Sequence, residues 1–352
     1  MKLTITAFVA SSIALFTMAG LNLKAKRNVL VNRATLEMVA KKRVFKRAKT
    51  IRPIKVVNRS LPAKSPAQLK HGALTTLSDG TKLSSIRVRG RNLKLVKGLG
   101  SNFSSRQWQR YGYLKKKSKQ GANVQWVLKN LDTNEVVSES SGADRMYYGA
   151  SVTKVLVGGA FLNSRKGKMT PRERQLMADM VTVSSNSAWG ALQNMTGGKG
   201  PSAMANVQAF TKGLKMEQTR SFRGWMGTIH GNETTAREMT DFLGATYNKE
   251  YPGASDLWKI MHATRTGNSK AGKYIPKDMV YGGKTGTYSG FTQHPETRKP
   301  YKSSVKHHTF TFSFNNVQYG MTVLTDGFSN EDLAIIAGGV IREKLNISKD
   351  AA

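Results

Sequence analysis

The stretch SVTKVLVGGAFL, residues 151–162, sets a serine and a lysine three positions apart at the head of an apolar, helix-compatible run. Residues three apart on a helix lie on one face, about one turn from each other. We therefore expect Ser151 and Lys154 on one helix face, with Gly158 and Gly159 allowing a neighbour to pack closely. A serine hydroxyl needs a nearby base to become a nucleophile, and a buried amine can be that base. Alone, the pair also fits a capping serine beside a surface lysine.

Ser184-Ser185-Asn186 is the second short motif along the chain. Because Ser184 and Asn186 are two residues apart, a short turn can point both side chains to one place. There Ser184 can relay a proton to a leaving nitrogen, and Asn186 can hold a substrate amide. The same residues also suit the N-cap of a helix over residues 188–195, and the two roles are compatible.

Lys284-Thr285-Gly286-Thr287 is the third motif and follows a strand-like segment. A lysine with two hydroxyls at a strand edge can bind a carboxylate, and a glycine lets a substrate backbone approach closely. A phosphate loop is rejected here, because Asp278 stands where its first glycine is required. The six histidines lack the spacing of metal ligands, so we expect neither a metal nor another cofactor.

The charge of the chain is extreme. Among 352 residues, 56 lysines and arginines face 21 acids, giving a formal charge of +35. Such a balance predicts contact with a polyanionic surface, such as an anionic envelope polymer or lipid. The chain has no cysteine, which excludes disulfides, thiolate chemistry and cysteine-ligated zinc.

The N-terminal part predicts the compartment. Lys2 precedes an apolar run from Leu3 to about Leu21, typical of a secretory signal, or of a membrane anchor if it is retained, over residues 1–25. We therefore expect an exported protein, periplasmic or extracellular, and no nucleic-acid partner. Residues 26–120 predict a basic, largely flexible arm with short ordered patches, among them a helix over Arg106 to Lys117.

The remainder, residues 121–350, predicts a single α+β domain. A β-hairpin around Asp132-Thr133-Asn134 opens it, and a mostly helical subdomain follows at about residues 155–265. Strands return at 279–283, 309–314 and 320–325, and an amphipathic helix over 331–345 ends the pattern. Strands at both ends with helices between them predict an antiparallel sheet, flanked by helices, with a helical subdomain inserted into it.

With these residues in place, the chain from about Gly121 to Leu345 resembles the class A serine β-lactamases and their penicillin-binding relatives. Thr264-Arg265-Thr266-Gly267 is similar to that family's approach to its third motif. The resemblance implies an acylated Ser151 with Lys154 as its base, and Ser184 and Asn186 as relay and amide binder. It also implies a carboxylate anchor and an oxyanion hole; the anchor residues are Lys284, Thr285 and Thr287, and the oxyanion donors are the backbone N–H groups of Ser151 and Thr287.

One departure from the family matters. Class A enzymes carry an Ω-loop glutamate that activates the deacylating water, whereas residues 220–232 here contain no acid. We therefore expect a peptidase acting on D-Ala-D-Ala-type amides of the peptidoglycan stem peptide, with β-lactams as substrates or slow inhibitors. A true β-lactamase, with His230 or Glu233 as a substitute base, is the first alternative. A non-catalytic cationic protein that binds an envelope polymer is the second.

Overall fold

A six-stranded antiparallel sheet holds the fold together. The computed structural model describes residues 74–222, 232–277 and 279–347. The strands of this sheet are β3 (Val96–Lys97), β4 (Val124–Asn130), β5 (Val136–Glu139), β9 (Val280–Gln293), β10 (Pro300–Phe314) and β11 (Val317–Asp326). Their spatial order is β3-β9-β10-β11-β4-β5, so strands distant in the sequence lie side by side, with β11 pairing with β4.

Two small sheets accompany the central one. The first pairs β1 (Arg87–Val88) with β2 (Arg91–Asn92). In the second, β8 (Asn232–Thr234) lies between β6 (Tyr147–Tyr148) and β7 (Arg220–Ser221). In the second sheet, the residues just before the first motif, in β6, pair with β8, and β8 also pairs with β7.

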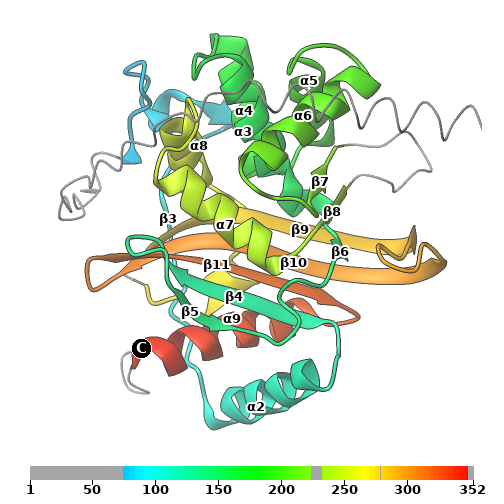
Figure 1. Cartoon of the computed structure of the whole chain (residues 1–352). Coiled ribbons are helices and arrows are strands. Elements are labelled where there is room, and N and C mark those ends of the chain that lie inside the picture. The colour runs from blue at the N-terminus through cyan, green and yellow to red at the C-terminus, as the bar shows by residue number, and fades with distance from the viewer. Residues whose placement is uncertain (1–73, 223–231, 278, 348–352) are drawn as a thin grey trace, which may run out of the picture. The chain divides into compact units, whose positions relative to one another are not determined.

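Helices cover both faces of the central sheet (Figure 1). Their bounds are α2 (Ser105–Lys119), α3 (Lys154–Ser164), α4 (Pro171–Thr182), α5 (Asn186–Asn194), α6 (Pro201–Gly213), α7 (Ala236–Tyr247), α8 (Ala254–Met261) and α9 (Asn330–Leu345), with short 3-10 turns η2 (Leu83–Ser85), η3 (Ala150–Thr153) and η4 (Ala271–Lys273). Helices α2 and α9 lie on one face, and α7 and α8 lie on the other with the rest of the helical subdomain. Along the described residues, no helix combines the length and apolar character needed to cross a bilayer.

The core between α9 and the sheet is rich in aromatic side chains. Phe310 and Phe312 of β10 pack there against the apolar face of α9 and against α2. Gly339 allows the two helices to approach closely, because a Cβ at this position would lie 2.5 Å from the Tyr111 ring of α2. Burial of this large apolar area fastens α2 to the domain.

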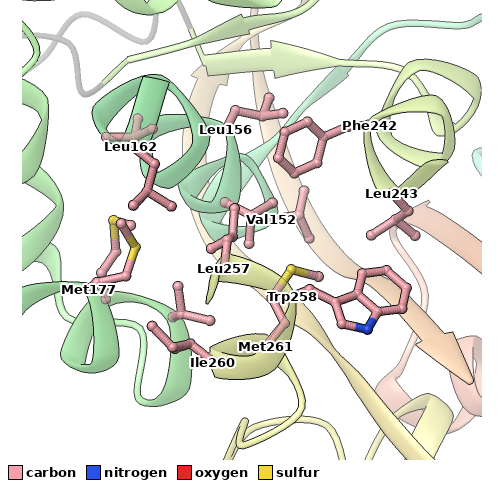
Figure 2. Packing of buried hydrophobic residues seen from close by; sticks show 14 of the residues in the cluster. Val152, Leu156, Leu162, Met177, Phe242, Leu243, Leu257, Trp258, Ile260 and Met261 are labelled. Atoms are coloured by element: carbon pink, nitrogen blue, oxygen red, sulfur yellow. The ribbon is translucent and has the colours of Figure 1, made fainter. Parts of the chain in front are cut away.

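The core on the other face joins η3, α3, α4, α7 and α8 (Figure 2). Figure 2 shows Leu162 of α3 near Met177 of α4, and Leu156 of α3 beside Phe242 of α7. Gly159 makes the predicted close contact, since a Cβ there would lie 2.8 Å from the Phe210 ring. Helix α3, which carries Lys154, is therefore packed on several sides.

The predicted α+β architecture is confirmed, including the antiparallel sheet and the helical subdomain between its strands. Strand β9, which carries the third motif, and strand β10 are longer than expected. The pattern placed them at 279–283 and 309–314, whereas β9 and β10 pair from Tyr281↔Phe312 to Gln293↔Pro300. The extra length, residues 284–293 and 300–308, is mostly threonine, serine, lysine, glycine and tyrosine and lacks a strong alternation of apolar and polar residues.

Residues 74–120 differ from the flexible arm that the sequence predicted. The predicted helix is present as α2, and β3 pairs with β9. Leu83, Val88 and Leu93 are buried in the core on the helical side of the sheet. These apolar residues are sparse among the cations, and they pack against residues that are distant in the sequence, so the local sequence pattern does not predict their burial. The predicted signal or anchor at 1–25 and arm residues 26–73 lie outside the described residues.

Candidate active site

The first motif forms a tight turn followed by a helix. Ser151 lies in η3, and Lys154 is the first residue of α3, its backbone N–H bonding to the Ser151 carbonyl. The spacing of the motif predicts both residues on one helix face, but the serine occupies the 3-10 turn directly ahead of the α-helix. Ala150 before it has a φ of +45°, a conformation unfavourable for a residue with a side chain. Strain of this kind gathers at functional sites.

Lys154 is fully buried, and its ammonium points at the second motif. Its Nζ donates to the Ser184 carbonyl at 2.6 Å and to Asn186 Oδ1 at 2.6 Å. The same Nζ lies 3.1 Å from Ser184 Oγ and 5.2 Å from the centre of the Trp189 ring. The first two motifs, predicted to act together, are therefore in direct contact.

The second motif divides its two predicted roles among its residues. Ser185 is the N-cap of α5, its hydroxyl accepting from the Ala188 N–H at 3.2 Å. Ser184 has a φ of +62°, which turns the chain just ahead of the helix. Ser184 and Asn186 both reach Lys154, so the capping role and the predicted site geometry coexist.

Lys284 of β9 completes the contact between the motifs. Its Nζ lies 2.9 Å from Ser184 Oγ and donates to the Thr285 carbonyl at 2.7 Å. One serine hydroxyl thus lies between two buried lysines. Burial, and then the charges of Lys154 and Lys270, hold the pKa of Lys284 well below its usual range. The array therefore favours states in which not every amine is protonated.

The end of the third motif packs against the η3 turn. A Cβ on Gly286 would lie 3.2 Å from the Gly149 carbonyl oxygen and 3.2 Å from Val152 Cγ1, so the glycine lets β9 pack closely against η3 without crowding these atoms. Thr285 is buried, whereas Thr287 is exposed next to Gly286. All the predicted site residues therefore belong to segments that meet around η3.

Lys270 is a member of this array that the sequence analysis missed. Its buried Nζ donates to the Gly286 carbonyl at 2.6 Å, to Thr287 Oγ1 at 2.9 Å and to the His307 carbonyl at 3.1 Å. Burial and the nearby Lys306 lower the pKa of Lys270 to about 7. Among 56 lysines and arginines, nothing in the sequence distinguishes this one; a buried lysine becomes visible only when the fold is known.

Comparison with known proteins agrees with this geometry. Residues 159–338, more than half of the chain, match the model of the family described as "Beta-lactamase enzyme family". The chain belongs to the beta-lactamase enzyme family. Within the match lie Ser184, Asn186 and the third motif, whereas Ser151 and Lys154 stand just ahead of it. Curated protein sequences give no significant match.

Solved beta-lactamase structures share the fold. A beta-lactamase from Chitinophaga pinensis aligns over 69% of this chain and 100% of its own, at 14% identity and a TM-score of 0.52. A class A beta-lactamase from Bacteroides cellulosilyticus aligns over 69% and 99%, at 18% identity and a TM-score of 0.53. One from Xanthomonas campestris aligns over 69% and 99%, at 15% identity and a TM-score of 0.53. At these identities the likeness shows the fold alone.

In this member of the beta-lactamase family, residues at both ends of the acid-free stretch donate hydrogen bonds to the η3 turn. Ser221 Oγ donates to the Thr153 carbonyl at 2.5 Å, and Asn232 Nδ2 donates to the Ala150 carbonyl at 2.7 Å. The carboxylate of Glu233 is buried and pairs with Arg298, with Arg220 at 4.0 Å. Glu233 is thus held by cations, and His230 lies outside the described residues.

Proposed function

We propose that this protein is an exported serine acyl-enzyme hydrolase that attacks the amide carbonyl of a D-Ala-D-Ala-type stem peptide or of a β-lactam. The observation that carries the proposal is the hydroxyl of Ser184 lying between Lys154 and Lys284, at 3.1 and 2.9 Å, beside the turn that holds Ser151. A serine nucleophile, an amine and a relaying hydroxyl are the parts that acyl transfer requires.

In the acylation step, Ser151 Oγ bonds to the carbonyl carbon and the C–N bond breaks. A neutral Lys154 takes the serine proton, and Ser184 passes a proton to the leaving nitrogen. Lys284, Thr285 and Thr287 anchor the substrate carboxylate, and Asn186 holds the amide. The backbone N–H groups of Ser151 and Thr287 stabilise the oxyanion. Water then cleaves the ester and releases Ser151.

Deacylation separates the two candidate activities. Residues 220–232 contain no acid, and the first acid after them is Glu233. Because the Glu233 carboxylate pairs with Arg298, this carboxylate is poorly placed to activate water. We therefore rank stem-peptide hydrolysis first, with β-lactams as slow substrates. Purified protein should hold a fluorescent penicillin covalently for many minutes and hydrolyse nitrocefin slowly. Rapid nitrocefin turnover would reverse this ranking in favour of a true β-lactamase.

A matched pair of variants tests the machinery. Lys154→Met should lower the acylation rate by about 10²-fold or more, because the serine proton loses its acceptor. Lys212 is an exposed residue of α6, and the Lys212→Met variant should be acylated like the wild type. Equal rates for the two variants would remove Lys154 from the mechanism.

The second candidate function is the binding of an anionic surface by the cationic residues of this protein. The outer side of α2 carries Arg106, Lys116 and Lys119 and no acid, whereas Arg110 pairs with Asp332 of α9 at 2.7 Å. Lys117 lies over the exposed Tyr113 ring at 5.8 Å. Such a face suits an anionic envelope polymer or lipid. Binding to anionic vesicles that falls steeply with salt and persists in Ser151→Ala would support it; wild-type protein that neither acylates nor binds would contradict both roles.

A further inference from the structure

An open pocket of about 440 Å³ lies in the helical subdomain. Two of its walls come from α3 and α6, which lie side by side (Figure 1), and residues that follow α5 and α7 complete the lining. Its volume falls within the range of about 300–1,000 Å³ that is usual for small-molecule sites. Its described lining includes none of the residues assigned to the candidate active site, so any ligand it takes is a separate one.

The pocket lies where several helices end. Asn163 and Ser164 are the last two residues of α3, and Gly213 is the last residue of α6. Thr196 follows the end of α5, and Glu250 follows the end of α7. The C-terminal end of a helix carries roughly half an elementary negative charge, so the helix ends in these walls favour a cation.

The polar side chains around the pocket have already used their hydrogen-bond donors. Ser164 Oγ and Thr196 Oγ1 each donate to the backbone carbonyl three residues earlier, both at 2.7 Å. Asn206 Nδ2 donates to the carbonyls of Thr196 and Gly197, at 3.2 and 3.1 Å. A hydroxyl or amide whose N–H and O–H groups are engaged can only accept a further hydrogen bond. These side chains therefore complement a ligand that donates.

The charge of the pocket is opposite to that of the chain. Glu250 is the single charged side chain in its described lining, whereas the chain as a whole has a formal charge of +35. No cation of the described residues pairs with Glu250. Arg165, next to the end of α3, pairs with Glu173 at 3.0 Å. Lys212 and Lys249 are exposed and do not line the pocket, so the Glu250 carboxylate is available to a ligand.

Phe210 and Tyr251 give the pocket an apolar wall. Both side chains are buried, and their rings pack edge-on with centroids 5.2 Å apart. Tyr251 Oη also shares a hydrogen bond of 2.8 Å with Thr246 Oγ1, which fixes the ring. Aromatic rings bury alkyl groups well and attract a cation to their faces. The lining thus combines an apolar wall with oxygen acceptors and one carboxylate.

We propose that this pocket binds an organic cation, namely a primary alkylammonium. Its charged end is received by Glu250 and the acceptor oxygens, and its alkyl stem packs against Phe210 and Tyr251. An ammonium group has three donors and no acceptor, which matches a lining whose own donors are engaged. The site is independent of the proposed function, because the two share no residue.

Pentylamine, pentanol and pentanoate are suitable probes, because they share one carbon skeleton and carry a positive, a neutral and a negative head at pH 7. Their dissociation constants for the full chain are measured from the NMR shifts of the backbone amides that line the pocket. Pentylamine should bind most tightly, and pentanoate should leave these amides unshifted. Glu250→Gln should weaken pentylamine about fivefold and leave pentanol nearly unchanged.

Two control variants accompany these measurements. Glu296→Gln removes an exposed acid from the turn between β9 and β10 and should bind pentylamine like the wild type. Ser151→Ala should also bind like the wild type, so the pocket and the acylation chemistry are tested separately. Pentanol binding as tightly as pentylamine, equal weakening by Glu250→Gln and Glu296→Gln, or no shift of the lining amides with pentylamine would each overturn the cation site and leave the proposed function standing.

Discussion

At the scale of single residues, the site is a cluster of buried lysines held by oxygen atoms without a formal charge. Lys154 and Lys284 share the Ser184 hydroxyl, and Lys270 binds two backbone carbonyls and Thr287. Burial lowers the pKa of both Lys270 and Lys284, because it removes water from around their charged form. Acyl transfer by a serine needs an unprotonated amine, and burial of these two lysines favours that form.

The lowered pKa of Lys270 makes the stability of the fold depend on pH. Its pKa falls from 10.5 to about 7 on folding. Between these values the unfolded chain binds the proton and the folded chain does not, so stability rises with pH across that window, by at most about 1.4 kcal/mol per pH unit. Below pH 7 both states bind the proton and this dependence ends.

We predict that Lys270→Met flattens this rise. Urea unfolding at pH 7 and pH 9 should show a gain in unfolding free energy that is about 1–3 kcal/mol smaller in Lys270→Met than in the wild type. Lys212→Met, at an exposed site, should keep the wild-type gain. Parallel dependence on pH in all three proteins would mean that Lys270 keeps its proton in the folded state.

At the scale of elements, α2 shows how a cationic sequence can conceal a packed helix. Its outer side has exposed cations, whereas Tyr111 and Leu114 are buried against α9 and the sheet. The helix was predictable from the spacing of its apolar residues. Its docking was not, because the partner α9 lies more than 200 residues further along the chain.

Leu114→Ala therefore should destabilise the whole domain. Leu114 is completely buried, so its truncation should lower the unfolding free energy by about 2–5 kcal/mol. Tyr113→Ala is the matched control on the same helix; Tyr113 is 48% exposed, and its loss should change stability by less than about 1 kcal/mol. Equal, small effects in urea unfolding would mean that α2 belongs to a loosely attached arm, as its composition suggested.

The β9–β10 hairpin is also connected to β8, by the ion pair between Arg298 and Glu233. Because the Glu233 carboxylate is buried, Arg298→Met should leave its charge poorly compensated and lower stability by about 2–3 kcal/mol. Adding Glu233→Gln should recover at least half of this loss, since the unpaired charge is then gone. Strict additivity of the two substitutions in urea unfolding would contradict a direct coupling.

At the scale of the whole molecule, the architecture followed from sequence patterns because the helices and the shorter strands carry a local periodicity. The β4–β5 hairpin, the helical subdomain and α9 all lie where these patterns predicted them. The motifs also met as expected, since Ser184 contacts both Lys154 and Lys284. Lys270, the long hairpin and the Arg298–Glu233 pair escaped prediction, because each depends on neighbours distant in sequence.

The most direct test of the account is the mass of the intact protein after incubation with benzylpenicillin, followed by mapping of the labelled peptide. The account predicts one added penicillin on the peptide containing Ser151, persisting for many minutes, and no addition to Ser151→Ala. An unmodified wild type, an adduct on another residue, or an equal adduct on Ser151→Ala would contradict it.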